Sequence, residues 1–407
     1  MIKRVDDFDP DDQRALDDPE MLYGPLREKC PVARSSRYGG FWAITRYEDV
    51  ERVMSDPETF TSSHGIIIPR NPASGRRAPL HYDPPEHTVF RKAINPIFRK
   101  DRLRRLSSYI HDLAHELIPP PDKAGPDGLV MDWYGQYCSP FSARVVCRLL
   151  NIPEALIDGL IAHIEIFEDA QRNRDTSTVE RENQAIYSIC RSAVEERSSD
   201  RLSENEDLVS ALLAIKDKDP SVDFDAVVGS LRQIVVAGHG APALVLASSV
   251  LHLSRDADLQ SRLRKNRPLV PSVVEEMLRL HTPNIGLART ATRDVAFRDR
   301  EILAGDPLAL VLPAVNRDPR VFDFPNEIVP GRPEHHLAFG VGPHVCPGSV
   351  IAREELSAAL DALLSATSSF SVEGEIAFSP WPTSGPTRLP LRLRFEQLTP
   401  LENSGSQ

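Results

Sequence analysis

Hydrophobic positions recur at helical spacing along most of the chain. Residues 142–216 carry this periodicity, interrupted by the polar segments NIPEA, QRNRDTST and SSDRLSENED. Residues 223–262 and 269–280 form two further apolar-rich helical stretches. Such spacing places apolar side chains on one face of each helix. The pattern predicts a mainly α fold with minor β structure.

Strand character is concentrated in residues 30–70 and 285–400. In the first region, FWAIT is rich in aromatic and β-branched residues and is followed by YEDVERVMSD, which has helical periodicity. In the second region, strand-like pieces surround AGDPLALVL. No internal repeat or low-complexity linker divides the chain, although 35 prolines punctuate it. We therefore expect residues 1–407 to form a single domain.

A helix start is predicted where the Gly-, Pro- and Ser-rich loop of residues 61–82 ends. Asp83 occupies the expected N-cap, Pro84 the first helical position, and Glu86 the position of a capping-box carboxylate. These three signals agree on a helix from about Pro84.

Charge and cysteine content narrow the class of protein. The chain has 48 Lys and Arg against 59 Asp and Glu, a net charge of -11, which argues against a nucleic-acid-binding face and favours a small-molecule substrate. No signal-peptide core begins the chain, and no stretch reaches about 18 uninterrupted apolar residues. We expect a cytoplasmic protein with no membrane or nucleic-acid partner.

Its five cysteines are widely spaced and lack zinc-like or disulfide-framework spacing: Cys30, Cys138, Cys147, Cys190 and Cys346.

The strongest chemical signal is the decapeptide FGVGPHVCPG, residues 339–348, followed by the helix-like SVIAREELSAALDALL. A cysteine at a helix start gains from the helix dipole and from free backbone N–H groups, which lower its pKa and prepare the thiolate for a metal. The glycines let the backbone lie close to a flat ligand. The alternative is that Cys346 is an inert, buried thiol in a Gly-rich turn.

This decapeptide resembles the heme-binding signature FxxGxxxCxG of cytochrome P450 enzymes, especially bacterial members with FGxGxHxC. The resemblance extends over most of the chain. It implies that Cys346 is the axial ligand to the iron of heme b, with Phe339, Gly340, His344 and Gly348 in the cofactor-binding loop. It also implies a P450-like fold, in which heme lies between a long central distal helix and the proximal cysteine loop.

Glu276 and Arg279 lie three residues apart, so they share one helix face and can pair. Such pairs are usually solvated surface salt bridges. Here they match the family's ExxR motif, and Arg332, in the Pro-Gly-Arg turn before the cysteine loop, matches its third partner. The resemblance implies a structural role for this triad.

His87 and Arg91 lie four residues apart on the helix predicted from Pro84, so both side chains can point at one anionic group. The segment DPPEHTVFRK resembles the family's DPPEHTxxR element, and Arg289 and His344 match its other contacts to the heme propionates. Any one of these residues, taken alone, is equally consistent with a solvated basic side chain.

The main departure from the family lies in residues 235–242, VVAGHGAP. Ala237 and Gly238 match the AG pair on the oxygen-binding face of the heme. Gly240 and Ala241 replace the acid and the threonine that follow it, and neither side chain can transfer a proton. Pro242 has no N–H and leaves the Gly238 carbonyl without its helical donor, so we expect a kink or a bound water.

Proton delivery is therefore expected to be atypical. One alternative is a tolerated helix distortion, with protons supplied by water or a substrate hydroxyl. His239 has a suitable ordinary pKa, but histidine also occurs here in relatives that keep the acid and the alcohol, which favours a packing or hydrogen-bonding role. Pro347 removes an amide N–H near sulfur, which predicts a more electron-donating thiolate and a lower heme potential.

Substrate contacts are implied by the resemblance for the segments 62–80, 160–185 and 383–386 and for Asn284, Ile285, Gly286 and Leu287. Arg70, Arg76 and Arg77 are candidates to receive an anionic group; the alternative is that they are solvated. No flavin or iron–sulfur motif occurs in the chain, so a separate ferredoxin and ferredoxin reductase are implied as electron donors.

The resulting prediction is a heme-thiolate monooxygenase that oxidises a small organic molecule, free or bound to a carrier protein, in a secondary-metabolite pathway. The alternative within catalysis is a peroxide-driven or non-hydroxylating heme-thiolate enzyme, suggested by the missing acid and alcohol. The rival from another class is a heme-binding sensor, which the lack of a recognisable output domain disfavours.

Overall fold

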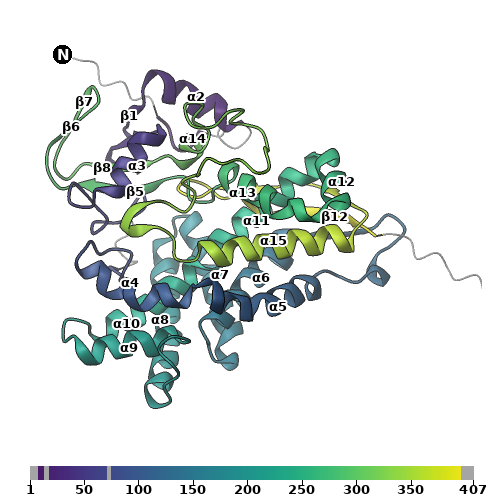
Figure 1. The fold of residues 1–407 in the computed structure, drawn as a ribbon, viewed down its shortest axis with the longest axis horizontal. Coiled ribbons are helices and arrows are strands. Elements are labelled where there is room, and N and C mark those ends of the chain that lie inside the picture. Colours follow the sequence, from purple (N-terminus) through teal and green to yellow (C-terminus); the bar gives the residue numbers. More distant parts are fainter. Residues whose placement is uncertain (1–7, 13–17, 71–74, 396–407) are drawn as a thin grey trace, which may run out of the picture.

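Helices account for most of the residues that the computed structural model describes, which are 8–12, 18–70 and 75–395 (Figure 1). The mainly α prediction is confirmed, and each polar break falls between two helices. The α-helices are α2 (Pro19–Lys29), α3 (Tyr47–Ser55), α4 (Glu86–Ile97), α5 (Lys100–Glu116), α6 (Ser139–Leu149), α7 (Glu154–Arg172), α8 (Thr176–Ser199), α9 (Leu208–Lys218), α10 (Phe224–Ala237), α11 (Gly240–Arg255), α12 (Ala257–Lys265), α13 (Val270–Leu280), α14 (Leu312–Val315) and α15 (Ser349–Ala366). Shorter helical turns are η1 (Arg37–Gly39), η3 (Pro121–Lys123), η4 (Tyr134–Cys138), η5 (Arg267–Leu269) and η6 (Gly342–His344).

The largest sheet joins strands from the two regions of predicted strand character. Its order is β1–β2–β8–β5–β3, and β2 runs parallel to β8 while the other pairs are antiparallel. A second sheet has the order β4–β12–β9, so β4 lies outside the predicted β-rich regions and its omission was an error. The strands are β1 (Val32–Ser35), β2 (Phe41–Ile44), β3 (Phe60–Thr61), β4 (Leu129–Asp132), β5 (Leu287–Ala291), β6 (Val295–Phe297), β7 (Arg300–Ile302), β8 (Pro307–Leu310), β9 (Ser369–Val372), β10 (Ala377–Phe378), β11 (Pro386–Arg388) and β12 (Pro390–Arg394).

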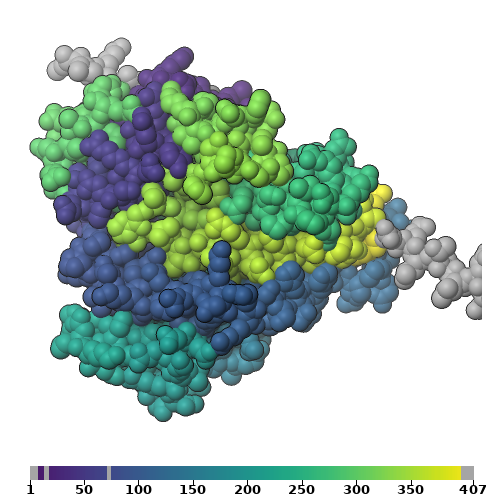
Figure 2. Space-filling model, in the orientation of Figure 1, coloured from purple at the N-terminus to yellow at the C-terminus, as the bar shows by residue number. Residues whose placement is uncertain are grey.

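One large apolar core joins helices α4 to α13 with α15. Two smaller clusters lie in the β-rich part, one around Phe41 and Trp381 and the other around Ile44 and Phe60. On the face shown in Figure 2, the yellow-green segment that contains α15 lies between the purple amino-terminal elements and the blue band of α4 and α5. Elements distant in sequence therefore enclose the carboxyl-terminal cysteine loop.

The apolar stretch predicted as one long helix over residues 223–262 is divided. Gly238 ends α10, and His239, with φ -96° and ψ -72°, precedes α11. Pro242 lies in the first turn of α11, where its missing N–H leaves the Gly238 carbonyl without the usual helical donor. The kink predicted from Pro242 is confirmed.

The segment Phe224–Arg255 is long and apolar enough to cross a membrane by length and hydropathy alone. However, 72% of its most apolar window is buried inside the protein. Burial of this kind identifies α10 and α11 as the central helices of the core.

The start of α4 differs from the prediction. Asp83 does not cap the helix, which begins at Glu86 with Pro85 as its N-cap residue and no side-chain cap. Instead the Asp83 carboxylate accepts hydrogen bonds from the Thr61 hydroxyl and, at 3.1 Å, from the Ser62 N–H. The predicted capping box was wrong because a tertiary contact to the end of β3 uses the same carboxylate.

The predicted triad of α13 forms a buried ion-pair network. Arg279 Nη2 lies 2.8 Å from Glu276 Oε2, with side chains 0% and 3% exposed. Arg332 Nε lies 3.2 Å from both carboxylate oxygens. Burial opposes ionisation, but Arg279, the Val329 N–H and Arg332 together hold the pKa of Glu276 below its usual value. Arg279 also donates to three backbone carbonyls, those of Asn316, Pro325 and Glu327.

We predict that Arg279→Met lowers the free energy of unfolding by about 3–5 kcal/mol, because it strips most of the compensation from a buried carboxylate. The control is Arg353→Met: Arg353 pairs with Glu275 at 2.5 Å, but both side chains are more than a third exposed (38% and 41%). That loss should be about 0–1 kcal/mol. Urea unfolding at matched cofactor content measures both; equal losses would contradict the prediction.

Candidate functional site

Cys346 lies in the loop between η6 and α15, whose N-cap residue is Gly348. The Cys346 N–H donates to the Phe339 carbonyl at 2.9 Å and so closes the loop. Gly342 has φ 76°, and a β-carbon there would lie 2.7 Å from the Met54 carbonyl oxygen of α3. Only glycine fits this approach, so the glycine pattern in the sequence reflects a real backbone constraint.

Several opposing effects set the pKa of the Cys346 thiol. Burial raises the pKa of the thiol, whereas a hydrogen bond from the Gly348 N–H and the positive charges of Arg91 and Arg353 favour the thiolate. Burial dominates, so the net lowering predicted from the helix start was wrong. A coordinating metal ion reverses that balance, because its charge is larger than any of these contributions.

Four basic side chains from separate elements gather beside this loop. His87 and Arg91 come from α4, Arg289 from β5, and His344 from η6; the ring centroids of His87 and His344 are 4.4 Å apart. Arg91 and Arg289 form no ion pair with a carboxylate among the described residues. Burial, followed by the charges of His344 and Arg91, lowers the pKa of His87 to about 4, and burial lowers the pKa of Arg289 to about 10.

Buried donors in this cluster lack partners. The Nε2 atoms of His87 and His344 have no hydrogen-bond partner within the described part of the chain. Asp83 is the nearest carboxylate, 3.8 Å from His344 Nε2. Buried polar atoms are rarely left unpaired, so the cluster is suited to carboxylates from a ligand. A sulfur ligand next to unpaired propionate-binding groups fits heme.

The α10–α11 segment presents one face to open space. Ala237 is exposed and Gly238, Ala241 and Pro242 are half-buried, whereas Gly240 is buried against Glu168 of α7. The predicted distal residues therefore divide between two faces. Ala237 ends α10 and Ala241 lies in the first turn of α11, and both are more exposed than Gly240 between them.

His239 points away from that open face. Its Nε2 lies 2.9 Å from the Ser139 hydroxyl, and its Nδ1 lies 3.4 Å from Glu168 of α7. The hydrogen-bonding interpretation of His239 is confirmed. The sequence did not identify Ser139 and Glu168 as partners of His239. The one signal in the sequence that pointed to such a partner was the absence of an acid at Gly240.

The segment predicted to contact substrate is partly internal. Ile285 is 7% exposed and packs in the cluster of Trp381, and a β-carbon on Gly286 would lie 2.2 Å from that indole ring. Asn284 and Leu287 are half-buried. Substrate contact therefore stays a prediction for Asn284 and Leu287, while Ile285 and Gly286 support the wall behind them.

The three arginines proposed as anion receivers have protein partners. Arg70 Nη2 lies 2.5 Å from the Thr290 hydroxyl, Arg76 Nε donates to the His81 carbonyl at 2.9 Å, and Arg77 Nε donates to the Gln233 amide oxygen at 2.7 Å. Arg76 and Arg77 line a cavity of about 660 Å³ bordered by α4, α8 and α10. Arg77 is therefore buried and anchored, whereas Arg70 and Arg76 each have a protein partner but remain exposed to solvent.

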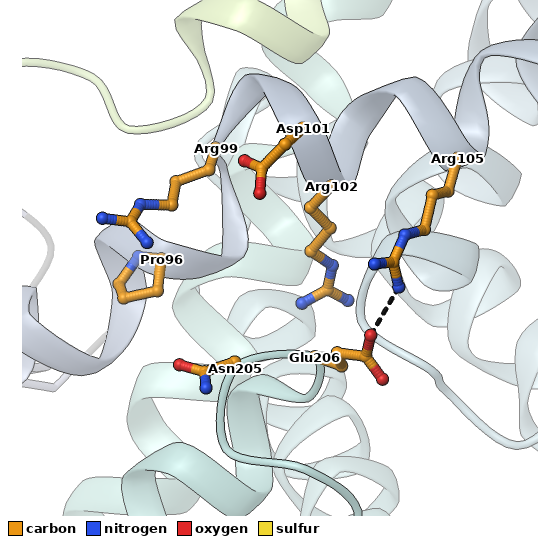
Figure 3. A pocket seen from close by; sticks show the side chains of 7 residues that line it. All are labelled: Pro96, Arg99, Asp101, Arg102, Arg105, Asn205 and Glu206. Carbon is orange, nitrogen blue, oxygen red and sulfur yellow. Dashed lines mark hydrogen bonds and ion pairs between the residues drawn. The ribbon is translucent and has the colours of Figure 1, made fainter.

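A smaller cavity of about 270 Å³ lies between α5 and the chain before α9 (Figure 3). Arg99, Arg102 and Arg105 border it, and Arg105 pairs with Glu206. It contains none of the predicted site residues, so it is separate from the cysteine loop.

Comparison with known proteins identifies the family. The cytochrome P450 family model matches residues 169–375. The chain is 32% identical to the mycinamicin IV hydroxylase/epoxidase of Micromonospora griseorubida, covering 84% of this chain and 86% of that protein. It is 32% identical to the nocardicin C N-oxygenase of Nocardia uniformis, covering 91% and 94%. The structure of CYP109Q5 from Chondromyces apiculatus superposes with a TM-score of 0.83 at 25% identity, covering 95% and 98%.

Fold, site and relatives together define a heme-thiolate oxidoreductase. The chain belongs to the cytochrome P450 family, and it is a monooxygenase with a heme-iron cofactor.

We predict that Pro347→Leu makes the midpoint potential of the heme iron more positive. Leucine restores a backbone N–H beside the Cys346 sulfur, which in the native loop accepts the Gly348 N–H, and hydrogen bonds to a thiolate reduce its electron donation. The control is Val345→Leu, an exposed position in the same loop that already has an N–H. Spectroelectrochemical titration measures the potentials; the same value for both variants would refute the effect.

Proposed function

We propose that this chain uses heme b, held by the Cys346 thiolate, to oxidise a small molecule of a secondary-metabolite pathway in the cytoplasm. Electrons come from a separate ferredoxin and its reductase, and residues 1–407 act as a single domain. The observation that carries the proposal is a basic cluster beside a potential sulfur ligand, in which His87 Nε2 and His344 Nε2 are buried without a hydrogen-bond partner among the described residues. Relatives named as a mycinamicin hydroxylase/epoxidase and a nocardicin N-oxygenase support the pathway class.

When bound, the heme supplies a redox-active iron that activates dioxygen. Cys346 would donate electron density to that iron, and because Pro347 has no N–H, the sulfur has one fewer hydrogen-bond donor beside it and would be a stronger electron donor. His87, His344, Arg91 and Arg289 hold the propionates and fix the cofactor's orientation. The buried position of these groups excludes water from the charged edge and strengthens each contact.

The open face of α10 and α11 would face the bound cofactor. Ala237 and Ala241 provide an apolar surface that limits water near the reacting atoms, and Asn284 and Leu287 contact substrate from the β5 side. Neither Gly240 nor Ala241 can pass a proton. Proton delivery therefore uses other groups, which makes it atypical for the family. The substrate is a small molecule that is either free or attached to a carrier protein.

A second candidate is peroxide-driven turnover, which specifically follows from Gly240 and Ala241. Hydrogen peroxide carries its own protons and electrons, so a site without the usual acid and alcohol has less need of a relay. Turnover with peroxide exceeding turnover with ferredoxin, reductase and oxygen would favour this second function.

The test of the proposed function is optical and catalytic. We predict that the reduced carbon monoxide complex of the native protein absorbs as a thiolate-ligated heme, and that Cys346→His replaces this with the spectrum of an imidazole-ligated heme and abolishes product formation. The control is Cys190→Ala, a buried thiol whose pKa burial raises to about 12. An unchanged spectrum in the Cys346 variant would overturn the ligand assignment.

Substrate class is found by titrating ferric protein with free acids, macrocycles and carrier-bound aminoacyl groups. Displacement of iron-bound water shifts the Soret band to shorter wavelength. Product analysis of each shifting compound, with ferredoxin and reductase and then with peroxide, separates the two candidate functions. Reversible ligand binding without product from any of these compounds would contradict both.

A further inference from the structure

The carboxylate of Glu168, on α7, occupies the space beside the buried Gly240 of α11. A β-carbon built on Gly240 would lie 2.3 Å from Glu168 Oε1, 2.8 Å from Cδ and 2.9 Å from Oε2. All three distances are below 3.0 Å, so the whole carboxylate fills the volume of a residue-240 side chain. Glycine at this position is therefore complementary to a carboxylate supplied by another helix.

Neighbouring groups hold Glu168 in that place. Oε1 lies 3.4 Å from His239 Nδ1, and Oε2 lies 3.9 Å from Arg172 Nη1 one turn along α7. The Glu168 side chain is 13% exposed. The acidic charge also acts on Arg232 and Tyr134, which face it from α10 and η4. These contacts fix the carboxylate against the break between α10 and α11.

A chain of polar groups leads from Glu168 to the surface, and its first link is the 3.4 Å ion pair of Glu168 with His239 Nδ1, an atom that forms no hydrogen bond among the described residues. His239 Nε2 lies 2.9 Å from the Ser139 hydroxyl, and that hydroxyl donates to Glu165 Oε1 at 2.5 Å. Glu165 is exposed to solvent. Burial lowers the proton affinity of His239, but the charges of Glu168 and Glu165 outweigh it and raise its pKa. The imidazole can therefore carry a proton between the two carboxylates.

We propose that Glu168 supplies, from α7, the carboxylic acid that the central helix lacks at Gly240, and that Glu165, Ser139 and His239 connect it to solvent. The proposal rests on the proposed monooxygenase function and deepens it. Glu168 is a positioning and proton-relay residue: it lies on the buried side of α11, away from the open face, so it would reach that face only through water at the break between α10 and α11 and would not touch substrate.

The proton balance is simple. The O–H bond of protonated Glu168 breaks, a water at the helix break takes that proton while releasing one of its own toward the cofactor, and the carboxylate is left charged. His239 then returns a proton to Glu168 and is itself recharged from solvent through Ser139 and Glu165. Over a turnover, a pair of protons and a pair of electrons from the ferredoxin reduce one oxygen atom to water, while the other enters the product.

A purely structural role for Glu168 makes a different prediction. The pair with His239 would then add stability, and its removal would lower the unfolding temperature without changing how efficiently reducing equivalents form product. The matched control is Asp169→Asn on the same helix: Asp169 lies 3.7 Å from Arg172 but is 67% exposed.

The first measurement compares native protein, Glu168→Gln and Asp169→Asn in the holoenzyme with ferredoxin and reductase. We expect Glu168→Gln to lower product formed per electron pair by at least about tenfold, since positioned proton transfer contributes typically 10²–10⁴-fold. Its pH profile of coupling should differ from that of the native protein, and Asp169→Asn should match the native protein. Equal coupling and equal pH profiles in all three proteins would overturn the proposal.

The second measurement is independent of activity. Gly240→Asp places a second carboxylate against Glu168, so we expect it to lower the thermal unfolding midpoint strongly. The same substitution in a Glu168→Ala background should lower it much less, and this double variant should recover coupling because the acid returns to the helix. Additive thermal shifts would overturn the placement of Glu168, and lack of recovery would overturn its role as the acid.

The two levels of failure are distinguishable. A native holoenzyme that forms no product with ferredoxin, reductase and oxygen from any compound that shifts the Soret band overturns the proposed function, and the relay with it. Active native protein with an unaffected Glu168→Gln variant overturns the relay alone.

Discussion

Burying Arg289 and half-burying Arg91 beside His87 and His344 costs free energy, because each guanidinium loses water and forms no ion pair with a carboxylate among the described residues. The cluster joins α4, β5 and η6, which are separated by long stretches of chain. An anionic cofactor that paired with these groups would offset that cost. Cofactor binding and folding are thus thermodynamically linked, since a ligand that binds only the folded chain stabilises it.

Much of this arrangement could be predicted from the sequence. The decapeptide around Cys346 specifies backbone geometry that few residues other than glycine adopt, so its glycine pattern alone indicates a close backbone approach such as the one at Gly342. Glu276 and Arg279 are readable because helical spacing alone brings them together. The break at Pro242 follows from a missing N–H, which is a local property of one residue.

Other features depend on contacts between distant segments, which local patterns do not encode. Asp83 has every mark of an N-cap, yet its carboxylate bonds Thr61 and Ser62. Strand β4 is recognisable only from its partner β12. The Cys346 thiol shows the same limit, since burial created by the whole fold outweighs the nearby amide that the sequence reveals. Glu168 is one acid among many on α7 until the fold brings it to Gly240.

The close fit of Glu168 against Gly240 also constrains how such a site changes over generations. The two positions compete for one volume, so their substitutions are not independent. If position 240 gains a side chain while Glu168 is still present, two groups are crowded into one space. If Glu168 is lost while position 240 is still glycine, no acid remains there. Either order crosses a less fit intermediate, so once established the pairing of glycine with a distant glutamate tends to persist, and the two residues are expected to covary.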